Sequence, residues 1–214
     1  MTRKILVVTA GLSQPSSTRL LADQLAAAVD AAVSGRGESV ELTVLELREL
    51  AVELATTLTT GGLPTPAIAA VREQVAAADG VIAVTPVFTA SYSGLFKMFF
   101  DVLDPDALTG TPVLIAATAG TPRHSLVLDH ALRPLFSYLH AVVAPTGVFA
   151  ATEDFGSGEL ADRIHRAATE FASLVVAAPN AVSGFLDGAL RQRRSGNSLP
   201  EPPPFAQLLA GHTG

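Results

Sequence analysis

Short apolar runs alternate along this chain with longer segments in which apolar residues recur every three or four positions. The short runs have the length and composition of buried or partly buried β-strands. They cover residues 5–9, 40–45, 81–85, 112–118 and 142–149. The longer segments have helical spacing and cover residues 17–33, 66–78, 94–103, 125–139 and 159–177. Residues 47–58 fit either a short helix or an irregular excursion.

Differences among the strands predict their places in a sheet. Residues 81–85 are apolar almost throughout, which favours a central strand, whereas residues 40–45 alternate with polar positions and favour a less buried one. Pro145 interrupts the fifth run and places it at an edge, because proline cannot donate to a sheet ladder. Pro134 predicts a kink in the helix over residues 125–139.

Strand and helix alternate five times, which predicts an α/β protein with a parallel sheet, right-handed crossovers and helices on both faces. Five such strands usually take the order 2-1-3-4-5 of the flavodoxin-like fold, with ligands at the carboxyl ends of the first and third strands. The loops over residues 9–18, 86–93 and 119–124 follow the first, third and fourth strands. We therefore expect these loops to meet at one site.

The length of 214 residues suits one sizeable domain, which we place at residues 1–179. Residues 180–214 form a C-terminal extension, in which the proline-rich stretch 199–205 is expected to be extended. The extension fits two interpretations, disorder or an arm that packs Phe205 and Leu208-Leu209 on a neighbouring subunit. The helix over residues 94–103 is apolar nearly all round, which predicts a two-fold dimer interface.

Composition narrows the chemistry further. Charged residues make up only 16% of the chain and the net charge is −6, so we expect neither nucleic acid nor a membrane surface as a partner. The chain has no cysteine, which excludes disulfides, thiol nucleophiles and cysteine-bound iron–sulfur clusters. Redox chemistry therefore needs a bound cofactor. The histidines lack metal-ligand spacing, and neither a signal peptide nor a membrane span is recognisable, so we expect a cytoplasmic protein without a metal.

The loop after the first strand carries the most informative chemistry. Glycine and proline allow a sharp turn, and four hydroxyl side chains stand where the first helix begins: Ser13, Ser16, Ser17 and Thr18. A helix start has unpaired N–H groups and a partial positive charge. Added hydroxyl donors make a cradle for a phosphate dianion. The alternative interpretation is that Ser16 or Ser17 only caps the helix.

Several competing chemistries lack their residues. A nucleotide-triphosphate loop needs a lysine that this loop does not have, and the fingerprint G-x-G-x-x-G is missing after the first strand. A phosphoacceptor domain of the same topology needs an aspartate at the end of the third strand, where Thr85-Pro86 stands. A serine hydrolase would pair Ser13 or Ser17 with His124, but the motif G-x-S-x-G is absent.

Three stretches resemble the NADPH-dependent FMN reductases of flavodoxin-like fold, and the resemblance covers residues 3–178. They are Gly11–Thr18, Thr85–Lys97 and Ala117–Thr121. The second is the most specific, with a proline, an aromatic residue and a serine ahead of a helix that opens with leucine and lysine. The chain looks most like the branch that supplies reduced flavin to two-component flavin-dependent monooxygenases. Phe88 and Thr89 stand where the family usually has tyrosine and often has asparagine.

This resemblance implies an NAD(P)H:FMN oxidoreductase that passes a hydride from NADPH to FMN and so supplies reduced flavin. The FMN phosphate is expected at Ser13, Ser16, Ser17 and Thr18. The isoalloxazine is expected between Pro86, Val87, Phe88, Thr89 and Ser91 on one side and Thr118, Ala119 and Gly120 on the other. Because the cofactors carry the chemistry, no side chain is expected to act as a catalytic acid or base.

The roles of two arginines near this site stay open, because each could bind a phosphate or simply lie on the surface. Arg123 either meets the 2′-phosphate of NADPH, which a guanidinium binds bidentately, or is a solvated loop residue. Arg19 either approaches the FMN phosphate or lies on the surface of the first helix. The expected partners are a second copy of the chain, in a homodimer or homotetramer, and a flavin-dependent monooxygenase.

Three rival functions remain open at this stage. The first is an FMN-dependent quinone or azo-dye reductase on the same fold, which differs only in its second substrate. The second is a flavodoxin-type electron carrier without turnover, although such carriers are typically more acidic and clamp the flavin between aromatic rings. The third is an interaction protein that binds no flavin.

Overall fold

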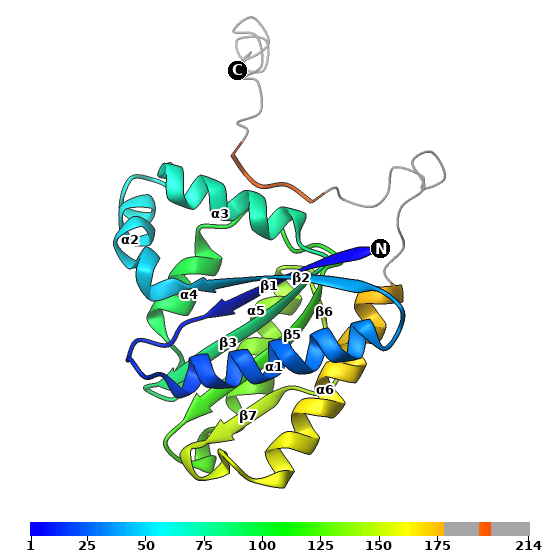
Figure 1. Ribbon diagram of the computed structural model, residues 1–214. Helices are drawn as coiled ribbons and strands as arrows, with labels where there is room; N and C mark the ends of the chain where they lie inside the picture. The colour runs from blue at the N-terminus through cyan, green and yellow to red at the C-terminus, as the bar shows by residue number, and fades with distance from the viewer. Residues whose placement is uncertain (178–192, 198–214) are drawn as a thin grey trace, which may run out of the picture.

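A parallel sheet forms the middle layer of the molecule, with its strands in the order β2-β1-β3-β5-β6 (Figure 1). The computed structural model describes residues 1–177 and 193–197 of the chain. The strands are β1 (Thr2–Thr9), β2 (Ser39–Glu46), β3 (Gly80–Phe88), β4 (Ser91–Tyr92), β5 (Pro112–Ala119), β6 (Val142–Val143) and β7 (Val148–Ala151). Both β6 and β7 pair in parallel with β5 and together make the expected fifth strand. The expected α/β class with a parallel sheet is therefore confirmed, although the sheet has seven strands instead of five, because β4 is added to β3 and the fifth strand is divided in two.

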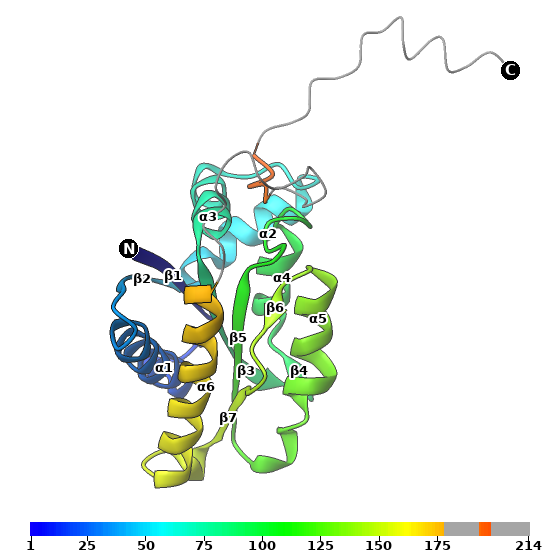
Figure 2. The same cartoon turned by 90° about the vertical axis from the view of Figure 1, so that its right-hand side faces the viewer.

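Helices cover both faces of the sheet (Figure 2). On one face lie α1 (Ser17–Ser34) and α6 (Gly158–Ala177); on the other lie α2 (Ala51–Thr59), α3 (Pro66–Ala77), α4 (Gly94–Asp101) and α5 (Arg133–Tyr138). Successive strand residues point to opposite faces, so Val7 packs toward α1 and α6 whereas Val8 packs toward the other layer. The segment 47–58 takes the helical alternative, with a 3-10 turn (Leu47–Leu50) leading into α2.

The two outermost strands match their sequence patterns. β2 pairs only with β1 among the described strands, and Leu42 and Val44 on it are 37% and 38% exposed. The fifth strand is broken between Val143 and Val148, around Pro145, as the missing N–H of proline requires. Both predictions, a less buried second strand and an interrupted edge strand, are confirmed.

The third strand is longer than expected. It does not end at Thr85 but continues through Pro86 to Phe88, and a hairpin returns it to β4. Pro86 is tolerated because pairing with β1 ends at Val84, so its missing N–H removes no bond from that ladder. Residues 86–93, expected as a loop, are therefore mostly a β-hairpin.

The tip of this hairpin is strained. Thr89 and Ala90 have φ values of 49° and 67°. Positive φ at both central positions is typical of a type I′ turn, which favours asparagine and glycine. For other residues the left-handed region costs about 1–2 kcal/mol each.

Replacing Ala90 by glycine is therefore expected to raise the free energy of unfolding by about 1 kcal/mol. Urea denaturation measures this change. The matched control is Ala55→Gly in α2, where an ordinary helical residue is replaced and about 1 kcal/mol is lost. If Ala90→Gly lost stability as Ala55→Gly does, the backbone of Ala90 would not be strained.

The helix expected over residues 125–139 contains an irregular turn just before Pro134. Residues Leu128–Leu132 form a π-helical turn, in which the N–H of Arg133 donates to the carbonyl of Leu128, and α5 follows. Pro134 thus lies in the first turn of α5, where no N–H is needed. Leu132 and Arg133 both have helical backbone angles, so the π-helical turn and α5 follow each other without a break. The kink expected at Pro134 stays a prediction, and the irregular turn beside this proline is a usual site of one.

Most of the apolar surface of α4 is used inside the chain. Phe96, Phe99 and Phe100 are buried, and the rings of Phe96 and Phe100 pack on Phe136 of α5 with centroid distances of 6.3 and 4.9 Å. Leu95 and Met98 are half-buried. The all-round apolarity of this helix is thus largely explained by its place between neighbouring elements.

A short part of the C-terminal extension contacts the edge of the sheet where the parallel strands begin. Arg193 donates to the carbonyl of Ala78 and to Thr111 Oγ1, residues that precede β3 and β5. Asn197 Nδ2 donates to the carbonyl of Ala69 and to Glu73 Oε1 on α3, both at 2.8 Å (Figure 1, orange). Residues 193–197 therefore dock on their own chain, whereas the predicted arm with Phe205 lies outside the described residues.

Candidate functional site

A cavity of about 350 Å³ lies where the carboxyl ends of β1, β3, β5 and β7 meet. Its lining comes from four separate loops and strand ends. The lining residues are Leu12, Ser13, Ser16, Ser17, Thr18, Pro86, Val87, Phe88, Thr118, Ala119, Gly120 and Thr152. The three loops singled out in the sequence thus meet, as their positions after parallel strands require.

One end of the cavity is the amino terminus of α1. Ser16 caps this helix, because its Oγ accepts a hydrogen bond from the N–H of Arg19 at 3.2 Å. The N–H groups of Ser17 and Thr18, the first two of the helix, have no acceptor among the described residues. Ser13 and Ser17 are exposed, and their hydroxyls are likewise unpaired within residues 1–177 and 193–197. This end therefore presents several unused donors at a positive helix terminus.

Gly11 lets the loop close tightly onto this helix start. A Cβ atom at Gly11 would lie 2.2 Å from Ser16 Oγ and 3.2 Å from the Cβ atoms of Ser16 and Thr18. Such distances are well inside van der Waals contact, so any side chain here displaces the capping hydroxyl. The glycine is thus needed for close approach.

A buried hydroxyl pair joins the two sides of the cavity. Thr18 Oγ1 and Thr118 Oγ1 lie 2.8 Å apart, and both side chains are 3% exposed. One of them donates to the other, which leaves one hydroxyl hydrogen of the pair to point elsewhere. The pair fixes the start of α1 to the end of β5.

Another part of the cavity lining comes from the end of β3. Pro86, Val87 and Phe88 line it, and Phe88 is 46% exposed although it is aromatic. Thr85 holds this strand end in place, since its hydroxyl donates to the carbonyl of Pro86 at 2.9 Å and accepts from the N–H of Ser93 at 3.1 Å. An apolar wall facing Ala119 and Gly120 suits a planar ring.

Three of the predicted site residues do not line this cavity. Thr89 and Ser91 lie at the hairpin tip and in β4, beside Phe88 but outside the lining. Arg123 is exposed in a 3-10 turn after β5, without an ion pair or hydrogen bond in the described part of the chain. Arg19 takes the surface alternative: its guanidinium pairs with Asp23 and Glu46, and Asp23 is the main cause of its raised pKa.

Sequence reasoning missed two residues of the lining. Leu12 is a large apolar side chain that is 53% exposed on the first loop. Thr152 directly follows β7, so the carboxyl end of the fifth strand also reaches the site. The second omission was avoidable, because the rule that gathered the other loops applies equally to the loop after the fifth strand.

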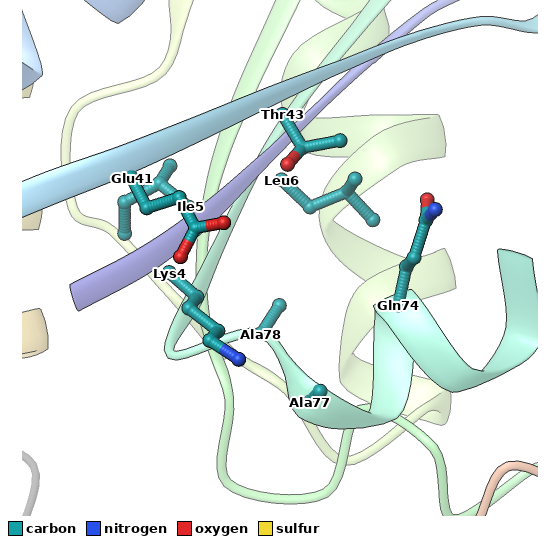
Figure 3. A pocket seen from close by; sticks show the side chains of 8 residues that line it. All are labelled: Lys4, Ile5, Leu6, Glu41, Thr43, Gln74, Ala77 and Ala78. Carbon is teal, nitrogen blue, oxygen red and sulfur yellow. The ribbon is translucent and has the colours of Figure 1, made fainter. Parts of the chain in front are cut away.

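Another cavity, of about 220 Å³, lies at the opposite end of β1 (Figure 3). Its lining includes Lys4 and Glu41 on neighbouring strands and Gln74 on α3, and the side chains of Lys4, Glu41 and Gln74 are all exposed. It shares no residue with the first cavity. Over the described residues there is no cluster of three or more potential metal ligands, and no helix has the length and apolarity to cross a membrane.

Comparison with known proteins assigns the chain to a family. The family described as NADPH-dependent FMN reductase matches residues 3–156, which is well over half of the chain. This chain belongs to the NADPH-dependent FMN reductase family. Two predictions from the sequence are thereby confirmed, namely the family and the activity class of an NAD(P)H:FMN oxidoreductase.

Relatives of this FMN reductase family member include enzymes named for either nicotinamide cofactor. The FMN reductase (NADPH) of Pseudomonas aeruginosa is 41% identical over 152 residues, covering 71% of this chain and 78% of the relative. The NADH-dependent FMN reductase SfnE of Pseudomonas putida is 40% identical over 172 residues, covering 77% and 88%. A solved oxidoreductase structure from Corynebacterium diphtheriae is 58% identical, with a TM-score of 0.79, and covers 82% of this chain and 97% of that one.

Proposed function

We propose that this family member reduces FMN with NAD(P)H and holds the FMN phosphate at the start of α1. The observation that carries this proposal is the group of unused donors there, formed by the N–H groups of Ser17 and Thr18 and the hydroxyls of Ser13 and Ser17. A dianion at this point accepts hydrogen bonds that otherwise go only to water. No basic side chain lines the cavity, so neutral donors and the helix terminus provide the recognition.

The residues present fit the rest of the flavin. Pro86, Val87 and Phe88 offer an apolar face for the isoalloxazine, and Ala119 and Gly120 leave space along its other side. When bound, FMN supplies the group that accepts a hydride from the nicotinamide. The lining residues from β3 and β5 would hold the ring and exclude water from the face that they cover. No side chain needs to move a proton for these tasks.

Several finer features belong to the same proposal. Arg123, exposed and unpaired in the described part of the chain, supports NADPH as the donor, since its guanidinium is available to a 2′-phosphate. A homodimer or homotetramer is proposed, with Leu95 and Met98 as the half-buried apolar residues that α4 leaves for contact. Export of reduced flavin to a monooxygenase is also proposed, and it is supported by the branch resemblance of the Thr85–Lys97 stretch. A cytoplasmic location stays a prediction from composition.

Steady-state oxidation of NADPH and NADH, with and without added FMN, tests the activity. We expect turnover that rises with added FMN and protein that is isolated partly free of flavin. Tightly bound flavin with turnover only on added quinone or azo dye would favour the rival reductase. Flavin binding without turnover would favour an electron carrier, and no flavin absorbance after addition of FMN would contradict the proposal.

A separate experiment tests the proposed phosphate-binding position at the start of α1. Ser17→Asp places a carboxylate beside the proposed dianion, so FMN binding is expected to weaken at least about tenfold. Riboflavin, which lacks the phosphate, is expected to bind as before. Ser34→Asp at the far end of α1 adds the same charge and serves as the control. If a flavin fluorescence titration showed unchanged FMN affinity for Ser17→Asp, the proposal that the phosphate binds at the start of α1 would be contradicted.

A further inference from the structure

A chain of charged side chains supports the outer side of the first loop. Arg48 lies in the 3-10 turn that follows β2, and its guanidinium reaches Gln14 in the middle of the loop. Because a guanidinium can only donate, the Gln14 amide turns its oxygen toward it. That oxygen accepts from Arg48 Nη1 at 2.8 Å and also from Nη2. Arg48 thus holds the loop through one oxygen atom, which accepts from two guanidinium donors.

Glu46, the last residue of β2, orients this guanidinium. Its Oε2 lies 2.7 Å from Arg48 Nη2, and its Oε1 accepts from Arg19 Nη1. Arg19 in turn donates from Nε to Asp23 at 2.7 Å. The side chains of Arg48 and Glu46 are 20% and 21% exposed, so the pair is partly screened from water and its geometry is constrained.

This cluster lines a cavity that adjoins the candidate flavin cavity. A third cavity, of about 280 Å³, is lined by Gln14, Arg19, Glu46 and Arg48, and it shares Ser13 and Ser16 with the candidate flavin cavity. The two cavities therefore adjoin at Ser13 and Ser16, and the arginines line only the outer one. Neither arginine lines the flavin cavity, so neither is placed to bind the phosphate directly.

We propose that Arg48 is a positioning residue for flavin phosphate recognition, which acts through Gln14 by holding the Ser13–Ser16 bend in its binding conformation. The inference rests on the proposed function, because it assumes that this bend receives the phosphate. A bend fixed before binding does not lose conformational freedom when the dianion arrives, which raises affinity without a new contact. Loss of Arg48 therefore weakens only those ligands that carry a phosphate.

The experiment compares FMN with riboflavin in flavin fluorescence titrations of Arg48→Met. We expect FMN affinity to fall about tenfold, the size of effect of one charge-assisted hydrogen bond, while riboflavin affinity is unchanged. In steady-state assays the KM for FMN rises and kcat at saturating FMN is retained. Arg36→Met is the matched control, because Arg36 joins the far end of α1 to α6. If loss of an arginine contact weakened FMN binding only through a general loss of rigidity, this control would weaken it as well.

A double-mutant cycle tests whether Arg48 acts through Gln14. Gln14→Ala removes the acceptor and is expected to weaken FMN as Arg48→Met does, and the two changes together are expected to cost no more than one alone. Arg48→Lys keeps one donor but not the fork, so it is expected to fall between wild type and Arg48→Met. Should Arg48→Met fail to fold, Gln14→Ala and Arg48→Lys decide the proposal.

The outcomes separate this inference from the proposed function. If the wild type binds FMN and riboflavin equally well, the proposed phosphate-binding position itself is wrong. If the wild type prefers FMN and the single variants keep that preference, only the role of Arg48 is wrong. Equal weakening of both flavins, or additive effects of Arg48→Met and Gln14→Ala, would likewise overturn it.

Discussion

Gly11→Ala is expected to weaken FMN binding at least about tenfold. The added methyl group would lie 2.2 Å from Ser16 Oγ, so that hydroxyl must leave its place as the cap of α1. Loss of the cap also lowers the free energy of unfolding by about 1 kcal/mol. The same methyl group crowds Thr18 and disturbs its contact with Thr118. A fluorescence titration with FMN and a urea denaturation curve measure the two effects.

Gly158→Ala provides the control for this prediction. Gly158 is the first residue of α6, it is exposed, and nothing lies within 4 Å of a Cβ atom at that position. The control is expected to keep the flavin affinity and to lose no stability. If Gly11→Ala behaved in the same way, the tight closure of the first loop would have no part in binding.

Gly80→Ala is expected to lower the free energy of unfolding by about 2 kcal/mol. Gly80 begins β3 at the amino edge of the sheet, where α6 approaches closely. A Cβ atom there would lie 2.7 Å from Phe171 Cζ and 2.9 Å from Val175 Cγ2. Phe171 and Val175 are fully buried, so they have no free space to move into, and the helix itself must shift.

Gly94→Ala is the matched control for stability, because a Cβ atom at Gly94 meets nothing within 4 Å and the position opens α4. It is expected to leave the urea midpoint unchanged or slightly higher, since alanine favours a helix over glycine. FMN affinity of folded Gly80→Ala is expected to stay near that of the wild type, because the substitution lies at the edge opposite the cavity. A stable Gly80→Ala variant would contradict the tight packing of α6.

The sequence predicted the site well where a simple topological rule applies. Loops after parallel strands must meet at one edge of the sheet, so Ser16, Phe88 and Gly120 line one cavity although they are far apart in the chain. The α/β class followed from the alternation of strands and helices. The individual roles of these residues toward FMN stay predictions, which the titrations above address.

Features that depend on local geometry were harder to predict. Thr85-Pro86 looked like the end of a strand, because proline usually ends a ladder. Pairing with β1 has already ended at Val84, however, so Pro86 interrupts no hydrogen bond on the β1 side and β3 continues to Phe88. The π-helical turn before Arg133 has no periodicity signal of its own. Arg48 could not be connected to Gln14, since only the folded chain brings the end of β2 beside the first loop.

The contact of Asn197 with α3 has a practical consequence for labelled forms of this enzyme. The side chain of Asn197 is held to Ala69 and Glu73 of α3, and none of these residues lines the flavin cavity, so a probe attached at position 197 stands apart from that cavity. Such a probe is expected to leave access of flavin and nicotinamide unobstructed, which makes Asn197 a suitable position for labelling.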